Sequence, residues 1–242
     1  LERLSDSLCD FVLQGGYDHG KSISQSPMDY SVLSNVNECK LTNLESLGLF
    51  IVPQDDERIW YRYHHLFADL LRTRLQSVSH ELIPALHRRA SIWFEKNGFF
   101  EESINHSLAA EDWDNASRLI DLRISSYLEN GQMATVMKWI DRFPQDELLN
   151  RPKLCVQVAE VYSQAGMIDQ IDPLLDRAEE IVTSMKYRGE VLDGEQAPDL
   201  SPEEIIVIRS MVAILRGLKE VCSGHPQRAI DITQAALGNI PE

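Results

Sequence analysis

Residues 60–75, WYRYHHLFADLLRTRL, concentrate more large aromatic and ionisable side chains than any other part of the chain. The first of them alternate as a strand does. From Tyr63 onwards, apolar residues recur at the three- and four-residue spacing of a helix with one buried face. His64 and His65 therefore fall where a strand passes into a helix. Backbone N–H groups at a helix start attract anions, so these two histidines are the first candidates for ligand contact.

A second stretch, Gly15–Ser22, reads GGYDHGKS and satisfies the phosphate-binding pattern G-x-x-x-x-G-K-[ST]. That chemistry needs a strand before the loop and a helix starting at the lysine. Here an amphipathic helix pattern precedes the loop, and Pro27 falls where the new helix would have to run. We interpret the match as a chance one within a flexible loop. The alternative, a nucleotide-binding enzyme, requires this chain alone to bind ATP with Mg²⁺.

Other chemically capable residues favour structural roles. The histidines His87, His106 and His225 are too scattered to suggest a metal site. The cysteines lack any CxxC pair, which favours reduced, packed thiols over a disulfide framework or a zinc site; they are Cys9, Cys39, Cys155 and Cys222. Trp93, Phe94, Trp113 and Trp139 have helix-packing spacing. No nucleophile–base pair stands out, so we expect neither a catalytic residue nor an enzyme.

The bulk composition is that of a globular protein: 242 residues, 43% hydrophobic and 25% charged. The net charge of −15 repels phosphate backbones, so we expect no direct contact with nucleic acid. No apolar run reaches the ~20 residues of a membrane span, and no secretory signal opens the chain. We therefore expect a cytoplasmic protein without membrane contact. The start at Leu1, without Met, suggests a piece of a longer protein.

The first 76 residues predict a winged-helix domain. A helix over residues 1–14 has Leu1, Leu4, Leu8, Phe11 and Val12 on one face. A loop follows over 17–30, then short helical pieces over 32–47. Two strands, at 49–52 and 59–63, flank a polar turn, and a helix follows them. The hairpin tip carries three acids, the wrong charge for a wing that touches DNA.

Residues 77–242 predict an α-solenoid of helical pairs. The inter-helix glycines Gly98, Gly131 and Gly166 are 33 and 35 residues apart, close to the 34-residue tetratricopeptide period. A polar loop over 188–200 interrupts the pattern before a helix capped by Ser201 and Glu204. The last unit matches the small-residue and proline positions of the repeat at Gly217, Ala229, Ala236 and Pro241. Small residues at such positions let paired helices approach closely. The fold class is mainly α with one small β-hairpin.

Three segments carry a resemblance to a known family: NLESLGLFIVPQDDERIWYRYHHLFADLLRTRL, LHRRASIWFEKNGFFEESINHSLAAEDWDNASRLI and RPKLCVQVAEVYSQAG. They resemble the middle of the MalT-type, LuxR-family ATP-dependent transcriptional activators, which belong to the STAND class of signal-transduction ATPases. The resemblance runs from about Leu1 to Glu242. It implies a winged helix and the start of a tetratricopeptide-like sensor. The P-loop ATPase domain and the DNA-binding helix-turn-helix of such proteins would lie outside this chain.

The resemblance also implies a role for His64. In related ATPases a Met-His-Asp run of the winged helix places its histidine against the β-phosphate of bound ADP. Tyr63, His64 and His65 stand at the equivalent strand-to-helix position, with Tyr63 in place of Met and His65 in place of Asp. The structural alternative is that one histidine packs in the hairpin–helix core while the other is exposed.

The function implied by the resemblance is regulatory. The helical repeats would bind a small-molecule inducer or a protein partner, and the winged helix would couple that event to the ATP/ADP state of the neighbouring ATPase domain. ATP and ADP would be cofactors of the parent protein and not of this fragment, and the parent would self-assemble when activated. The alternative is a stand-alone tetratricopeptide scaffold for protein interactions.

Overall fold

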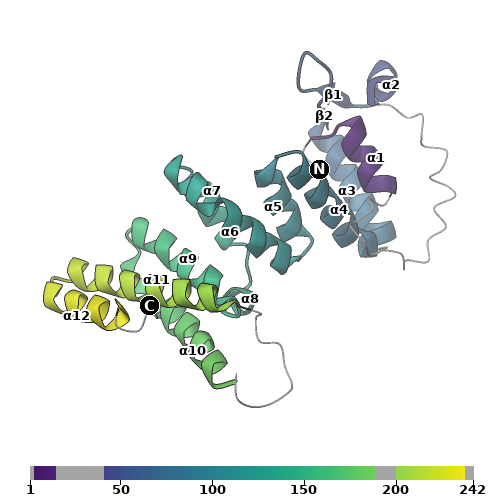
Figure 1. Ribbon diagram of the computed structural model, residues 1–242. Helices are drawn as coiled ribbons and strands as arrows, with labels where there is room; N and C mark the ends of the chain where they lie inside the picture. Colours follow the sequence, from purple (N-terminus) through teal and green to yellow (C-terminus); the bar gives the residue numbers. More distant parts are fainter. Residues whose placement is uncertain (1–2, 15–40, 189–199, 238–242) are drawn as a thin grey trace. The chain divides into compact units, whose positions relative to one another are not determined.

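The structure is a computed structural model that describes residues 3–14, 41–188 and 200–237 (Figure 1). The loop predicted over 17–30 and the pattern at Gly15–Ser22 lie outside these residues, as does Pro241. The chain divides into two compact units, Leu1–Leu119 and Ile120–Glu242, so the division falls inside one helix. The predicted boundary at residue 76 stays a prediction.

The first unit contains a small hairpin surrounded by helices. Its elements are α1 (Asp6–Gln14), α2 (Leu41–Ser46), β1 (Ile51–Pro53), β2 (Tyr61–Tyr63), α3 (His65–Ser79), a 3₁₀ turn (His80–Leu82), α4 (Ile83–Lys96), α5 (Phe100–Ala109) and the start of α6 (Trp113–Glu129). A mainly α fold with one two-stranded antiparallel hairpin is therefore confirmed in the part of the chain that the structure describes.

The hairpin pairs Ile51 with Tyr63 and Pro53 with Tyr61. Leu4 adds an isolated bridge to the free edge of β2: its N–H donates to Tyr61 O over 2.7 Å, and Tyr61 N–H donates back to Leu4 O over 2.8 Å. The helix predicted from residue 1 therefore begins only at Asp6, because Leu4 is used as a strand residue. Both predicted strands exist and are shorter than expected.

Two apolar clusters form the core of the first unit. One contains Leu4, Leu41, Ile51 and Tyr61 and lies against the hairpin. The other joins α1 to α4 and contains Leu8, Val12, Ala90, Trp93 and Phe94. Since α1 contributes to the second cluster while its preceding residue Leu4 contributes to the first, the N-terminal helix ties the hairpin to the first helical pair. The predicted core role of Trp93 and Phe94 is confirmed.

Helix α3 corrects one prediction. The apolar stripe through Leu66 and Leu70 was expected to be buried, but no residue of α3 is buried, and these two side chains are 68% and 61% exposed. The sequence of α3 is apolar on more than one side, because Leu71 and Leu75 lie on roughly the opposite side of the helix from Leu66. The predicted stripe also contained Leu71, so periodicity alone did not separate the inner leucine from the exposed Leu66 and Leu70.

The second unit is a series of helical pairs, seen in Figure 1 in teal to yellow. After the rest of α6 come α7 (Met133–Ile140), α8 (Gln145–Leu149), α9 (Pro152–Gln164), a 3₁₀ turn (Ile168–Gln170), α10 (Asp172–Arg188), α11 (Pro202–Cys222) and α12 (Pro226–Leu237). Helix α7 ends at Ile140, and the short α8 follows Pro144. Trp139 is buried, as expected for a core residue.

The first helix of each pair ends in the same way in both units. Gly98, Gly131, Gly166 and Gly224 have φ between +71° and +81°, and the residue after each glycine donates its N–H to the carbonyl five positions back. This left-handed glycine turn satisfies the last carbonyl groups of the helix and reverses the chain. The three glycines whose spacing predicted a repeat therefore all occupy the inter-helix turns.

Helix α11 starts at the predicted cap. Ser201 Oγ accepts from Glu204 N–H over 3.2 Å, and Glu204 Oε2 accepts from Ser201 N–H over 2.9 Å. These two bonds satisfy otherwise unpaired amides at the helix start. The Ser201 N–H bond, with help from nearby Lys153, holds the pKa of the Glu204 carboxyl below its usual value.

No helix in the described part of the chain is long and apolar enough to cross a membrane.

Candidate functional site at the start of helix α3

The hairpin fixes the backbone at the start of α3. His64 N–H donates to Phe50 O over 2.7 Å, and His64 O accepts from the N–H groups of Phe67 and Ala68, each over 2.9 Å. His64 is thus the N-cap residue of α3, and its side chain makes no capping bond to the helix. The predicted passage from strand to helix at this histidine is confirmed.

Both histidine side chains are exposed. The rings of His64 and His65 lie 4.3 Å apart between centroids, tilted by 34°. Neither packs in the hairpin–helix core, which removes the main reason for reading His64 as a structural residue. The two rings stand beside the amide end of a helix that has no acidic residue in its first turn. Such an end carries partial positive charge, so the surroundings suit an anionic ligand.

Aromatic packing supports this corner. Phe50 has φ of +53°, a left-handed conformation that is unusual for a bulky residue. Its ring packs 5.3 Å from that of Phe67 on α3, and Tyr63 packs 5.6 Å from the same ring. The carbonyl of Phe50 also receives the His64 N–H. These contacts hold the strained Phe50 and the last strand residue, Tyr63, against the first turn of α3, beside His64.

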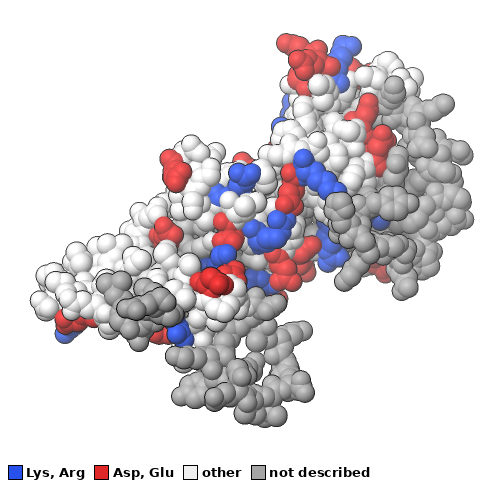
Figure 2. All heavy atoms as spheres, in the orientation of Figure 1, with Lys and Arg blue, Asp and Glu red and all other residues white. Residues whose placement is uncertain are grey.

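The far end of the hairpin is acidic. Asp55 Oδ1 accepts from Ile59 N–H over 2.9 Å and Asp55 also binds Trp60 N–H, so this carboxylate closes the turn. Asp56 and Glu57 remain exposed, and acidic side chains gather at the tip of the hairpin (Figure 2). The negative charge expected from the sequence is thus displayed where a DNA-binding wing would carry positive charge.

Trp60 joins the hairpin to the first helical pair. Its ring meets Trp93 of α4 edge-on at 6.0 Å and Phe99 at 5.3 Å. The Arg3 guanidinium lies 4.5 Å from the Trp60 ring centroid and forms an ion pair with Glu102 of α5 over 3.0 Å. A displacement of the hairpin would therefore disturb α4 and α5, because cation–π, aromatic and ionic contacts join the hairpin to these helices.

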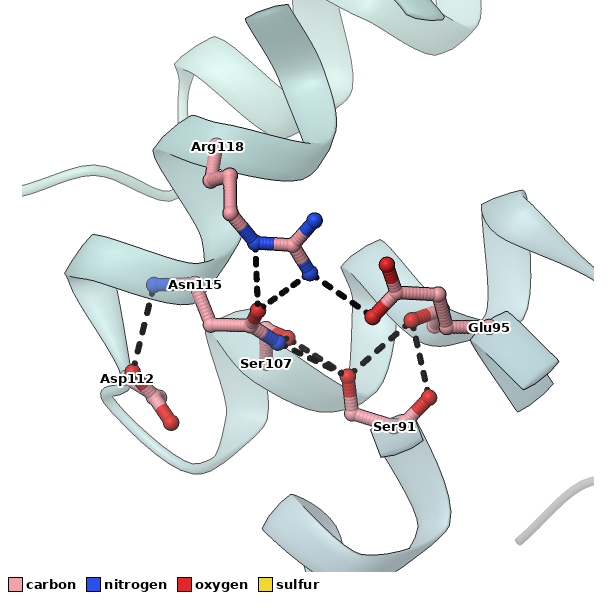
Figure 3. Close-up of polar contacts among 7 residues, drawn as sticks. Ser91, Glu95, Ser107, Asp112, Asn115 and Arg118 are labelled. Carbon is pink, nitrogen blue, oxygen red and sulfur yellow. Dashed lines mark hydrogen bonds and ion pairs between the residues drawn. The ribbon is translucent and has the colours of Figure 1, made fainter. Parts of the chain in front are cut away.

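A buried polar network links α4, α5 and α6 and was not predicted (Figure 3). Ser91 Oγ lies 2.7 Å from Ser107 Oγ and 3.0 Å from Ser103 Oγ, and all three serines are buried. Asn115 Nδ2 donates to Ser107 Oγ over 2.9 Å. Arg118 Nη2 then binds both Asn115 Oδ1 and Glu95 Oε2, each over 2.7 Å. The network joins three helices through buried polar side chains, so it helps to position these helices.

The structure brings together two histidines that seemed scattered in the sequence. His87 of α4 and His106 of α5 lie with their Nδ1 atoms 2.7 Å apart, and the ring of His106 stacks on Phe94. Spacing along one helix cannot reveal such a pair, because the two residues come from different helices. Among the residues described, no group of three or more potential ligands could hold a metal ion.

The described cysteines are free thiols, at Cys9, Cys155 and Cys222. Burial raises the pKa of Cys9 to about 11 and that of Cys155 to about 12, so both stay protonated and inert. Cys222 is exposed, contrary to the expectation of a packed thiol. Cys39 lies outside the described residues.

In the second unit, ion pairs line the sides of the helical pairs. Lys153 of α9 lies 2.8 Å from Asp121 of α6 and 3.5 Å from Glu204 of α11, and the bond to Asp121 raises the pKa of Lys153. Arg216 of α11 binds Asp176 and Glu179 of α10, each over 2.7 Å. These pairs are at least a quarter exposed, and their arrangement favours alignment of neighbouring helices over ligand chemistry.

Comparison with known proteins agrees with this geometry. The family pattern of the MalT winged helix domain matches residues 1–83. The chain carries a MalT winged helix domain. It is also 28% identical over 255 residues to the HTH-type transcriptional regulator MalT of Serratia proteamaculans, an alignment that covers 98% of this chain and 26% of that protein. The chain is therefore related to MalT-type transcriptional regulators along almost all of its length.

A second relative has a different name. The serine/threonine-protein kinase PknK of Mycobacterium tuberculosis is 27% identical over 197 residues, which cover 81% of this chain and 17% of the kinase. The chain thus spans about a quarter or less of the length of these curated relatives. No solved structure matches the chain. The chain is thus similar to parts of a protein named as a kinase and of one named as a transcriptional regulator.

Proposed function

We propose that this chain is the coupling part of a signal-responsive regulator. In this proposal the MalT winged helix senses the ATP/ADP state of a neighbouring P-loop domain, and the helical pairs receive a small-molecule inducer or a protein partner. ATP and ADP belong to the parent protein, and the chain itself catalyses nothing. DNA would be bound by another domain of the parent, which self-assembles when activated.

The observation that carries the proposal is the exposure of His64. It stands at the N-terminus of α3, and its backbone is fixed by Phe50 and by the first turn of the helix. An exposed, positioned imidazole beside helix amides suits a phosphate of a nucleotide held by another domain. Trp60 and Arg3 then connect the same hairpin to α4 and α5, which gives a physical route from nucleotide to helical pairs.

The coupling is a matter of differential affinity. An inducer switches the protein only if it binds the ADP-free form more tightly than the ADP-bound form. Loss of the His64 contact weakens ADP binding and shifts the population in the same direction as the inducer does.

His64→Ala tests this role. We expect ADP affinity of the full-length protein to fall by about tenfold or more, the scale of one charge-assisted hydrogen bond. Transcription of a target gene should become less dependent on inducer. His80→Ala is the matched control, since His80 is an exposed histidine at the other end of α3. ADP affinity is measured by calorimetry, and thermal melting of the nucleotide-free variants checks folding.

Unchanged ADP affinity in His64→Ala would remove the nucleotide role and favour the second candidate, a scaffold of helical pairs for protein interactions. That candidate has one observation in its favour: the segment is shared by a named kinase and a named transcriptional regulator. It leaves the exposed histidine pair at α3 without a use.

A further inference from the structure

A pocket of about 570 Å³ that is partly open to solvent lies in the first unit, lined by residues of α1, α3, α4 and α5. This volume falls in the range of small-molecule sites. Its walls are mostly apolar: α3 contributes Ala68, Leu71 and Leu75, and α4 contributes Ile83 and Leu86. Leu71 and Leu75 are partly exposed, so the pocket is in contact with solvent and a ligand could enter it.

The cavity accounts for the exposure of α3. Leu71 and Leu75 belong to the side of the helix that faces the body of the unit, yet they remain 36% and 38% exposed. Both side chains line the pocket, and part of their apolar surface stays open to solvent. Filling the cavity with an apolar group would remove this surface from water, which is favourable in proportion to the area covered.

The polar groups in the lining are positive or neutral. Arg72 comes from α3, His87 from α4 and His106 from α5. Cys9 of α1 and Tyr63 of β2 complete the set; the Cys9 thiol stays protonated because burial raises its pKa to about 11. Among the described residues that line the pocket there is no carboxylate, and Asp69 pairs with Arg72 over 3.0 Å on α3.

The histidine pair constrains its own charge. With the two Nδ1 atoms 2.7 Å apart, one Nδ1 donates a proton and the other accepts it. The contact is compatible with a neutral pair or with one extra proton, but not with two imidazolium rings, which would place two N–H groups against each other. The pair can therefore supply one positive charge, and a nearby anion would favour that charged form.

We propose that this cavity binds an amphiphilic anion, an alkyl or aryl carboxylate. The apolar part would lie between α3 and α4, and the carboxylate would be recognised by Arg72 and the His87–His106 pair. Binding would take up a proton at the pair, so affinity rises as pH falls. The occupant would bridge α3, which begins at His64, to the first helical pair, and would act as an effector of the winged-helix unit. Its binding does not depend on the proposed nucleotide role.

The test uses the 242-residue chain and decanoate, with decan-1-ol as the uncharged comparison, in titration calorimetry. We expect saturable binding of one decanoate, at least about tenfold tighter than decanol. The decanoate affinity should be higher at about pH 6 than at about pH 8. The double variant His87→Gln, His106→Gln should flatten this pH dependence, because no imidazole is then left in the described lining to take up the proton.

Two variants locate the site. Leu71→Trp places a large ring in the cavity and should abolish binding, while Arg72→Gln should weaken decanoate binding by about tenfold and leave decanol unchanged. Arg74→Gln is the control, since Arg74 is exposed on the same helix and does not line the cavity. Circular dichroism checks that each variant folds. Absence of saturable binding, equal affinity for acid and alcohol, or unchanged binding in folded Leu71→Trp would each overturn the proposal.

Discussion

At the scale of single residues, the serine network shows how buried hydroxyls can define the arrangement of helices. Ser91 contacts the hydroxyls of Ser103 and Ser107 and also receives the Asn115 amide over 3.3 Å. A buried hydroxyl without a partner costs about 1–3 kcal/mol, whereas a satisfied one contributes modestly. Only one relative position of α4, α5 and α6 satisfies all of these groups, so the network fixes the register of the first helical pair on α6.

Removal of the hub hydroxyl should be costly but not disruptive. Ser91→Ala leaves Ser103 bonded to the Ser91 carbonyl and Ser107 bonded to Asn115, so each keeps one partner. We expect a loss of about 1–2 kcal/mol in the free energy of unfolding, measured by urea denaturation. Ser117→Ala is the control, because Ser117 bonds only to a carbonyl of its own helix in an exposed position. A loss no larger than in the control would contradict this account.

At the scale of elements, close approach of paired helices depends on small residues. A Cβ on Gly217 of α11 would lie 3.3 Å from Thr233 Oγ1 and 3.7 Å from Ala229 O, both on α12. Gly217 is buried, and Thr233 Oγ1 bonds to Ala229 O over 2.8 Å. The predicted role of Gly217 and Ala229 as small residues at a helix pair is consistent with this geometry. The helices are near enough that a longer side chain must move one of them.

Two substitutions at Gly217 separate helix propensity from packing. Gly217→Ala gains up to about 1 kcal/mol of helix propensity and meets one tight contact with a side-chain oxygen, so we expect little net change. Gly217→Leu overfills the contact and should destabilise by about 1–3 kcal/mol. Urea unfolding followed by circular dichroism measures both. Similar stability of the leucine variant and the wild type would show that α12 can move away freely.

At the scale of the whole molecule, charge decides which partners are accessible. With 38 acidic and 23 basic residues the chain has a net charge of −15, and the hairpin tip of its winged helix is acidic. Such a field slows the approach of a polyanion, an effect that is strongest at low salt. We therefore expect the winged helix to contact protein and not DNA.

We expect this chain to leave a DNA duplex unshifted in a gel, even at low ionic strength, where non-specific binding is strongest. The double variant Asp56→Lys, Glu57→Lys reverses the charge of exposed tip residues without touching Asp55, which closes the turn. It should acquire weak, salt-sensitive binding. Salt-sensitive retention of DNA by the wild-type chain would show that a local basic face outweighs the net charge.

Local signals in the sequence determined a large part of this protein. The glycines at 98, 131 and 166 marked the helix ends, because only glycine accepts the left-handed turn there without cost. The capping box of Ser201 and Glu204 marked the start of α11. The change from strand to helix periodicity of the apolar residues at His64 marked the start of α3. These features depend on neighbours a few positions apart, so the chain encodes them locally. The resemblance in the same segments identified the winged helix.

Only the tertiary structure decided which faces and which distant residues meet. The outward position of Leu66 depends on where α1 and α4 lie, and periodicity within α3 carries no information about that. The His87–His106 pair, the serine network and the cavity beneath α3 each combine side chains from several helices. Helix packing sets such distances, and the side chains of one helix cannot specify them alone. The sequence thus determined the elements and their ends, while packing determined the candidate sites.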